Sequence, residues 1–193
     1  MRRSRILAAA CLLSVLGAGP ASAALERYTF DPVHTQVLFF VSHLGFSNSA
    51  GKFLAFDGGF SFDPDSWASS SVDVGIRTAS INMDDQKWEK HLRSEDFFNV
   101  QKYPVMGFKS TKVEQTGERQ ALIHGDLTLL GVTRPVTLEA TFNKAGVHPK
   151  SKQHVAGFSA RTVVKRSEFG MNYGVPMLGD DVEVRLEVEG IRQ

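Results

Sequence analysis

The chain has 193 residues, and its 22 basic and 21 acidic side chains give a formal charge of +1 at pH 7. This near balance does not suggest nucleic acid or an anionic membrane surface as a partner. Because the chain has a single cysteine, no internal disulfide can form, and a packed core must stabilise the fold.

The first 23 residues are predicted to be a secretory signal peptide. Three arginines precede an apolar run over residues 6–16, and Ala21-Ser22-Ala23 forms a small-residue cleavage site. Cys11 lies in this segment and could mark a lipoprotein. Two features argue against lipidation: Ala8 stands three residues before the cysteine, where leucine is expected, and the apolar run continues past Cys11. Cleavage after Ala23 leaves 170 residues with a formal charge of −2. We expect residues 24–193 to form one exported domain.

Alternation with a period of two runs through most of the remaining chain. In residues 182–189, for example, valines and a leucine alternate with charged side chains. Successive side chains of a strand point to opposite faces, so such segments bury one face and expose the other. The expected strands are residues 27–30, 35–43, 51–62, 71–81, 105–113, 121–130, 136–142, 155–165 and 181–191.

Residues 84–100 do not fit a strand. Apolar residues recur at helical spacing from Trp88 to Leu92, and Ser94 is a suitable cap for a second turn that contains Phe97 and Phe98. We predict a crossover with two short helices, placed over an opening or an edge of the sheet.

About eight strands favour an all-β fold, an eight-stranded antiparallel barrel with this short helical crossover. A strand of about ten residues spans roughly 33 Å, and a tilt of about 40° leaves a barrel on the order of 25 Å tall. An interior of this shape suits a lipid tail better than a sugar or a nucleotide.

The predicted lining of that interior is rich in phenylalanine, and all 14 phenylalanines lie after the signal peptide. Taken singly, such residues are more often simple core residues. The segment 37–41 is apolar on both faces, so one face can line a cavity while the crossover covers the other. The predicted ligand-binding residues are Val37, Phe39, Val41, Phe53, Phe56, Val74, Ile76, Phe97, Phe98, Phe108, Leu127, Leu129, Phe142 and Phe158.

Several segments, in order along nearly the whole mature chain, resemble the YceI-like family. They are Asp31-Pro32-Val33-His34-Thr35 with His43-Leu44-Gly45 and Gly51-Lys52-Phe53, the run from His91 to Phe98 with Tyr103-Pro104, Gly125 to Leu129 with Gly131 to Val136, and Arg166 with Phe169-Gly170. The resemblance implies a lipocalin-like barrel in the periplasm that binds a polyisoprenoid or similar long-chain amphiphile. Leu130 stands where many relatives carry histidine, which leaves the head-group preference open.

The polar residues form no recognisable catalytic or metal-binding motif. His34 and His43 have opposite parity, so one regular strand would place them on opposite faces. The sequence has no His-Glu-x-x-His, no Gly-x-Ser-x-Gly and no calcium or dinucleotide loop. We therefore expect no catalytic residue, metal or cofactor. Arg93 and Arg134 are candidates for a charged lipid head, although salt bridges explain them at least as well.

Two other functions fit the same sequence features less well. Signal peptide, length and alternation also occur in small outer-membrane barrels, but those need an apolar outer face and aromatic girdles, and one face of the last strand is charged. An enzyme acting on a lipid in the cavity is the second alternative. We predict a binding protein without stable membrane insertion, and a homodimer is compatible with the sequence.

Overall fold

The computed structural model describes residues 25–193, and the predicted signal peptide lies outside them. The strands are β1 (Glu26–Phe30), β2 (Gln36–His43), β3 (Ser47–Phe53), β4 (Phe56–Phe62), β5 (Ser71–Arg77), β6 (Ile81–Asn82), β7 (Val105–Gln115), β8 (Gln120–Leu129), β9 (Val132–Val147), β10 (His154–Lys165) and β11 (Leu178–Arg192). The α-helix of this region is α1 (Gln86–Leu92), and 3-10 turns occur at Trp67–Ser69, Thr78–Ser80 and Arg166–Phe169. No helix in residues 25–193 has the length and apolar character needed to cross a membrane.

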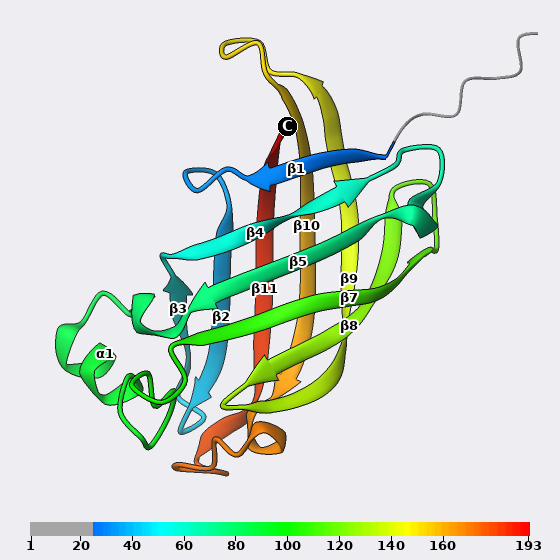
Figure 1. Ribbon diagram of the computed structural model, residues 1–193. Coiled ribbons are helices and arrows are strands. Elements are labelled where there is room, and N and C mark those ends of the chain that lie inside the picture. Colours follow the sequence, from blue (N-terminus) through cyan, green and yellow to red (C-terminus); the bar gives the residue numbers. More distant parts are fainter. Residues whose placement is uncertain (1–24) are drawn as a thin grey trace, which may run out of the picture.

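Three pairs of consecutive strands act as single composite strands, so the wall is an eight-stranded antiparallel barrel (Figure 1). β1 and β2 follow each other along the same edge of β11, where Thr29 pairs with Ile191 and Val37 pairs with Leu186. β3 continues into β4 and β5 into β6, and the two composite strands pair with each other along both halves. The predicted fold class is therefore confirmed.

The bends in two composite strands lie inside segments that alternation predicted as continuous strands, residues 51–62 and 71–81. Leu54 and Ala55 separate β3 from β4, and the 3-10 turn Thr78–Ser80 separates β5 from β6. The two corners hold each other, because the Ala55 N–H donates to Ser80 Oγ at 3.0 Å and the Leu54 N–H to the Ser80 carbonyl at 3.2 Å. Each strand thus turns without losing its partner.

The crossover contains one helix, and the predicted second helix is wrong. Asp85 caps α1 by accepting a hydrogen bond from the Trp88 N–H at 2.8 Å. After α1 the chain forms only turns, in which the Phe98 N–H donates to the Leu92 carbonyl at 3.0 Å, and Asn99 adopts a positive φ of 44°. This bond is not an i→i−4 bond of an α-helix, and the left-handed Asn99 prevents a helix from continuing past Phe98.

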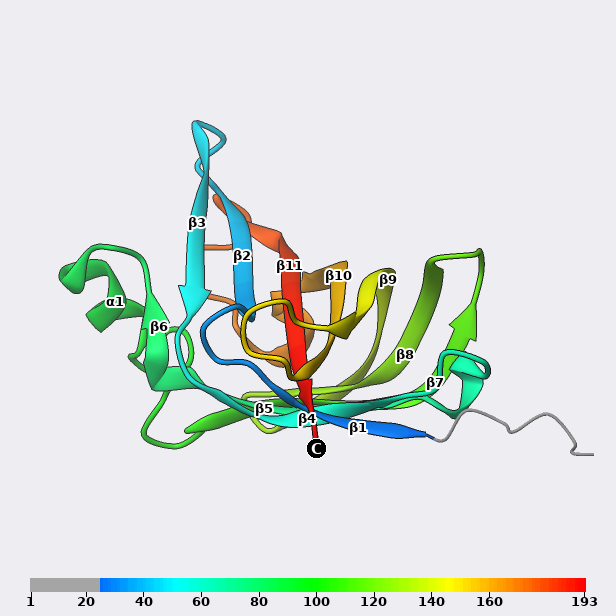
Figure 2. The same ribbon diagram turned by 90° about the horizontal axis from the view of Figure 1, so that it is seen from above.

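A buried carboxylate attaches the crossover to the barrel. Glu89 of α1 accepts hydrogen bonds from the Asn82 side chain at 3.0 Å and from the Met83 N–H at 3.1 Å, and it pairs with Arg93 at 3.1 Å. α1 therefore lies beside β6 at the edge of the wall, as Figure 2 shows. The predicted position of the crossover at an edge agrees with this arrangement.

The outward face of β2 is covered differently from the prediction. Phe40 lies under the guanidinium of Arg185 on β11, 4.6 Å from the ring centroid. The crossover instead reaches the inner side of the β3 edge, where the Phe98 ring meets the Phe53 ring at 5.4 Å. The expectation that residues 84–100 cover the outer face of segment 37–41 is therefore wrong at Phe40.

Candidate ligand-binding cavity

The barrel encloses an apolar cavity of about 460 Å³. This volume lies within the usual range for small-molecule sites, about 300–1,000 Å³. All fourteen residues predicted from the sequence lie in its lining. Several of them, including Val41, Val74 and Phe158, are only half-buried because they face this space. That they contact a ligand remains a prediction.

One end of the cavity is closed by interlocked aromatic rings. Phe62 lies 5.7 Å from Trp67 and 5.1 Å from Phe158 between ring centroids. Phe142 completes the cluster, 5.9 Å from Trp67 and 5.4 Å from Phe158. Most of these rings meet edge to face, the arrangement that aromatic quadrupoles favour. Phe62 and Trp67 are buried, so this end forms a floor.

Glycines on neighbouring strands give the lining phenylalanines their room. A β-carbon on Gly125 of β8 would overlap the ring of Phe108 on β7, and one on Gly190 of β11 would overlap the ring of Phe60. The large ring of one residue thus occupies the space left by the small neighbour. The glycines let these rings lie close to the wall, which keeps the centre of the barrel open.

The opposite end of the cavity is open to solvent. His43, Trp88, His91 and Tyr173 line the cavity and are also exposed. The His43 and Trp88 rings lie 6.1 Å apart, and the His91 and Tyr173 rings lie 5.0 Å apart. These four side chains come from β2, from α1 and from the connection between β10 and β11. We call this group the entrance.

Large apolar side chains surround the entrance on two connections between strands. In the turn between β2 and β3, Leu44 is 47% exposed and Phe46 is 89% exposed. Met177, before β11, is 68% exposed, and its carbonyl accepts a hydrogen bond from the Leu44 N–H at 3.1 Å. Exposed apolar groups gathered at one place on a surface usually mark a contact with a lipid or a protein.

Arg166 holds one side of the entrance in place. It is only 4% exposed, and its guanidinium donates to the carbonyls of Gly179 at 2.7 Å, Met171 and Tyr173 at 2.9 Å, and Leu178 at 3.1 Å. Burial lowers the pKa of Arg166, which the nearby charge of Asp180 opposes. Because its donors already bond to the backbone, Arg166 positions the loop and is not free to bind an anion.

The two arginines considered for a lipid head group also make structural contacts. Arg93 donates to the carbonyls of Ala79 at 2.9 Å and Ile81 at 2.7 Å, and it pairs with Glu89. Arg134 reaches the Glu168 carbonyl at 3.4 Å from an exposed position. Structural contacts, and not a lipid head group, therefore account for the position of Arg93.

Sequence reasoning missed much of the lining. Val182, Val184, Leu186 and Val188 of β11 all line the cavity, and their regular alternation was a sufficient signal. Trp88, His91 and Tyr173 at the entrance carried no such signal, because they lie outside the strands.

Comparisons with known proteins identify relatives of the whole barrel. A family model described as the YceI-like domain matches residues 28–190. A UPF0312 protein of Ectopseudomonas mendocina is 42% identical over 187 residues, 97% of each chain. The crystal structure of the Campylobacter jejuni YceI protein is 33% identical, with a TM-score of 0.71 over 79% of this chain and 90% of that chain.

A more distant structure shares the fold. A polyisoprenoid binding domain from Saccharophagus degradans matches with a TM-score of 0.66 over 88% of this chain and 100% of that chain. The two sequences are only 14% identical.

Proposed function

The chain belongs to the YceI-like domain family, and we propose that it is a periplasmic binding or carrier protein for a polyisoprenoid or similar long-chain amphiphile. The observation that carries this proposal is the apolar cavity of about 460 Å³, with an aromatic floor and one open end. The hydrocarbon chain would lie inside, and the polar head would stay at the entrance near His43 and His91. Export depends on the predicted signal peptide.

The energetics of burial support this class of ligand. Each buried methylene contributes about 0.8 kcal/mol, so a tail of roughly fifteen to twenty carbons gains on the order of 12–16 kcal/mol before costs. Ordering of the tail and loss of free motion offset part of this gain. A net free energy of about 8–12 kcal/mol corresponds to dissociation constants between micromolar and nanomolar.

The structural neighbour from Saccharophagus degradans is described as polyisoprenoid binding, which supports the same ligand class here. The lining supports it as well, because a dry wall of phenylalanine, valine and leucine side chains makes few hydrogen bonds to a guest. A branched hydrocarbon chain needs none. A sugar or nucleotide would leave its polar groups unpaired in this cavity.

The outer surface of the barrel favours a carrier over an outer-membrane barrel. Charged pairs lie on the outward faces of the last three strands, as in Arg161 with Glu139 and Arg185 with Glu183, both at 2.7 Å. Charged groups on a lipid-facing wall are costly at the depth of the acyl chains. These pairs support a barrel that holds lipid on its inside. Extraction of the protein into buffer without detergent tests this choice, because an outer-membrane barrel would stay in the membrane fraction.

Organic extraction of the native purified protein, followed by mass spectrometry, tests the proposed ligand. We expect a long-chain prenyl lipid or a related amphiphile at about one copy per chain. A delipidated sample should then take up a fluorescent prenyl probe and release it when the extracted lipid is added. The proposal fails if the extract contains no amphiphile and the delipidated protein also takes up no probe.

A further inference from the structure

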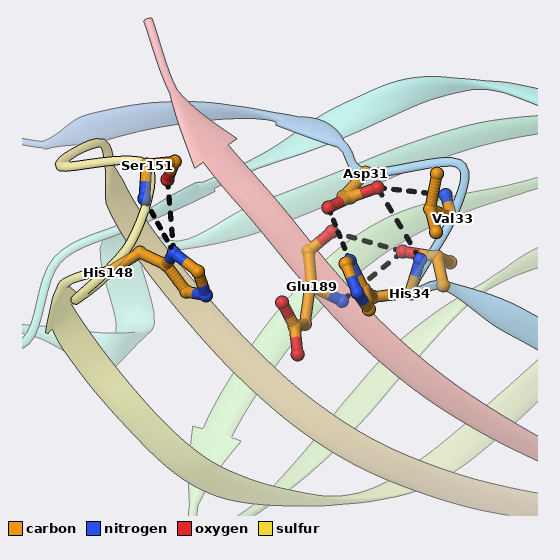
Figure 3. A network of polar contacts seen from close by, with 7 residues as sticks. Asp31, Val33, His34, His148, Ser151 and Glu189 are labelled. Atoms are coloured by element: carbon orange, nitrogen blue, oxygen red, sulfur yellow. Dashed lines mark hydrogen bonds and ion pairs between the residues drawn. The ribbon is translucent and has the colours of Figure 1, made fainter.

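A group of potential metal ligands lies on the outside of the barrel, at the end of β2 remote from the entrance. Asp31 and His34 belong to the turn between β1 and β2, and Glu189 belongs to β11 (Figure 3). One ligand atom from each residue lies within 4.8 Å of the other two. Two carboxylates and one imidazole are ligands that divalent transition metals accept.

The backbone around this group is fixed by hydrogen bonds. Asp31 Oδ1 accepts from the Val33 N–H at 2.8 Å, and the Asp31 N–H donates to the Glu189 carbonyl at 2.8 Å. The hydroxyl of buried Thr35 donates to the same carbonyl at 3.0 Å. The turn and β11 therefore hold the three residues together without using the side chain of Glu189.

Among the described residues, one carboxylate of the group is free, and the other is hydrogen-bonded to the histidine and to the backbone of the turn. His34 Nδ1 lies 2.8 Å from Asp31 Oδ2. Within residues 25–193, the Glu189 carboxylate makes no hydrogen bond or ion pair, although the residue is half-buried. An unpaired carboxylate beside an imidazole is a vacant ligand position. Two carboxylates and a neutral imidazole also balance the charge of a divalent ion.

A hollow of about 240 Å³ adjoins the group and leaves room for water on the ion. His34 and Glu189 line it, together with Lys144 and Glu187, which carry opposite charges. His148 lines it too, but His148 Nδ1 accepts a hydrogen bond from the Ser151 N–H at 3.1 Å. The neutral ring then carries its proton on Nε2, so His148 is poorly suited as a ligand.

We infer that Asp31, His34 and Glu189 bind a divalent transition-metal ion of the Zn²⁺ type, with water in the remaining positions. Zinc bonds to imidazole nitrogen and carboxylate oxygen are about 2.0–2.2 Å long, so tetrahedral ligands stand roughly 3.3 Å apart. The ion would replace the hydrogen bond between His34 Nδ1 and Asp31 Oδ2, which now lie 2.8 Å apart. The ion would link the turn between β1 and β2 to β11. This site is separate from the apolar cavity.

Titration of the mature, untagged protein with Zn²⁺ against a chromophoric chelator tests this inference. We expect one strong site per chain, and Glu189→Gln and His34→Gln should each weaken it at least tenfold. His148→Gln is the matched control, because it removes an imidazole from the same hollow and should leave binding unchanged. Addition of Zn²⁺ should also raise the Tm of the wild type and not that of Glu189→Gln.

Glu189→Gln keeps the shape of a side chain that makes no bond, so the variant should fold, which circular dichroism can check. Co²⁺ in place of Zn²⁺ should give visible absorption bands that disappear in the same variant. The inference is wrong if Zn²⁺ binds the wild type no more tightly than Glu189→Gln. It is also wrong if His148→Gln weakens binding as much as His34→Gln, since that result indicates nonspecific histidine binding.

Discussion

Phe39 on β2 lies directly opposite Gly51 on β3, and its ring occupies the space that a β-carbon on Gly51 would fill. The sulfur of Met83 would also overlap with such a β-carbon. Phe39 and Met83 both line the cavity, so Gly51 determines how far they can withdraw from it. The free volume of the barrel thus depends on a residue that has no side chain.

Gly51→Ala should therefore reduce lipid uptake. The new methyl group would push the Phe39 ring and the Met83 side chain into the cavity, since both are the mobile ends of side chains. Overpacking of this kind costs about 1–3 kcal/mol of stability. Uptake of a prenyl probe should fall while circular dichroism still shows the barrel. Double replacement with Phe39→Leu should restore uptake, and a double variant as poor as Gly51→Ala would contradict this explanation.

Phe108→Trp should plug the cavity from another strand. Phe108 is buried over Gly125, so a larger ring has no room along the wall and must extend inward. We expect the affinity for a prenyl probe to fall about tenfold, or ~1.4 kcal/mol. Val163→Trp on β10 is the control, because Val163 is 61% exposed on the outer face. Unchanged affinity in Phe108→Trp would show that Phe108 does not contact the ligand.

The strands and their inward faces could be predicted because alternation is a local property of the sequence. Residues 51–62 and 71–81 were correctly expected to be extended, but the corners within them were not foreseen. Those corners depend on Ser80 bonding to Ala55, a contact between residues 25 positions apart. The second helix was also wrong, since Ser94 as a possible cap could not indicate that the Phe98 N–H would bond to the Leu92 carbonyl.

The candidate sites were predicted mainly where a strand carries them, and Phe97 and Phe98 of the crossover are the exceptions. Tyr173 belongs to a connection without alternation, and the buried guanidinium of Arg166 sets its position. Glu189 meets Asp31 and His34 only because β11 closes the barrel against β1 and β2. Motif spacing compares residues close in sequence, so it predicted no metal site and gave His34 a structural role.

Ligand binding should slow hydrogen exchange in residues 84–100. Phe97 and Phe98 line the cavity from this crossover, and a bound chain would give them additional apolar contacts. Local opening of the segment would then require loss of those contacts, which lowers the population of the open state. Mass-spectrometric exchange with and without a prenyl lipid measures this effect. The hairpin over residues 143–153 provides the internal control. Equal exchange of residues 84–100 with and without the lipid would contradict the prediction.

Asp180→Asn should reduce stability at neutral pH and have less effect in acid. Desolvation acts to raise the pKa of Asp180, but hydrogen bonds from the N–H and hydroxyl of Ser167 and the charge of Lys165 outweigh it, so the pKa lies below the ordinary 3.8. A lowered pKa contributes stability that is present above the unfolded value and is lost as pH falls through the folded value.

We expect a loss of about 1 kcal/mol at pH 7 from the weaker hydrogen bonds of an amide. Urea unfolding of both proteins at neutral pH and well below the ordinary pKa of 3.8 measures the difference. The two curves should approach each other in acid, where Asp180 becomes protonated in the wild type. A difference that stays constant with pH would mean that the charge of Asp180 contributes nothing.

Removal of the apolar side chains around the entrance should slow lipid exchange with membranes. Phe46 and Met177 are the most exposed of these side chains, at 89% and 68%, and they lie beside the entrance, through which a lipid chain would reach the cavity. Without them, the leading part of the chain crosses water, at about 0.8 kcal/mol for each exposed methylene. The double variant Phe46→Ser, Met177→Ser should therefore take up a prenyl probe from vesicles about tenfold more slowly, or ~1.4 kcal/mol in the barrier. Equilibrium affinity measured in detergent should stay the same, since neither residue lines the cavity.

Val33→Ser with Val147→Ser removes exposed apolar side chains from the opposite end and is the matched control. Equal slowing in both double variants would show that general surface hydrophobicity, and not the entrance, controls the rate.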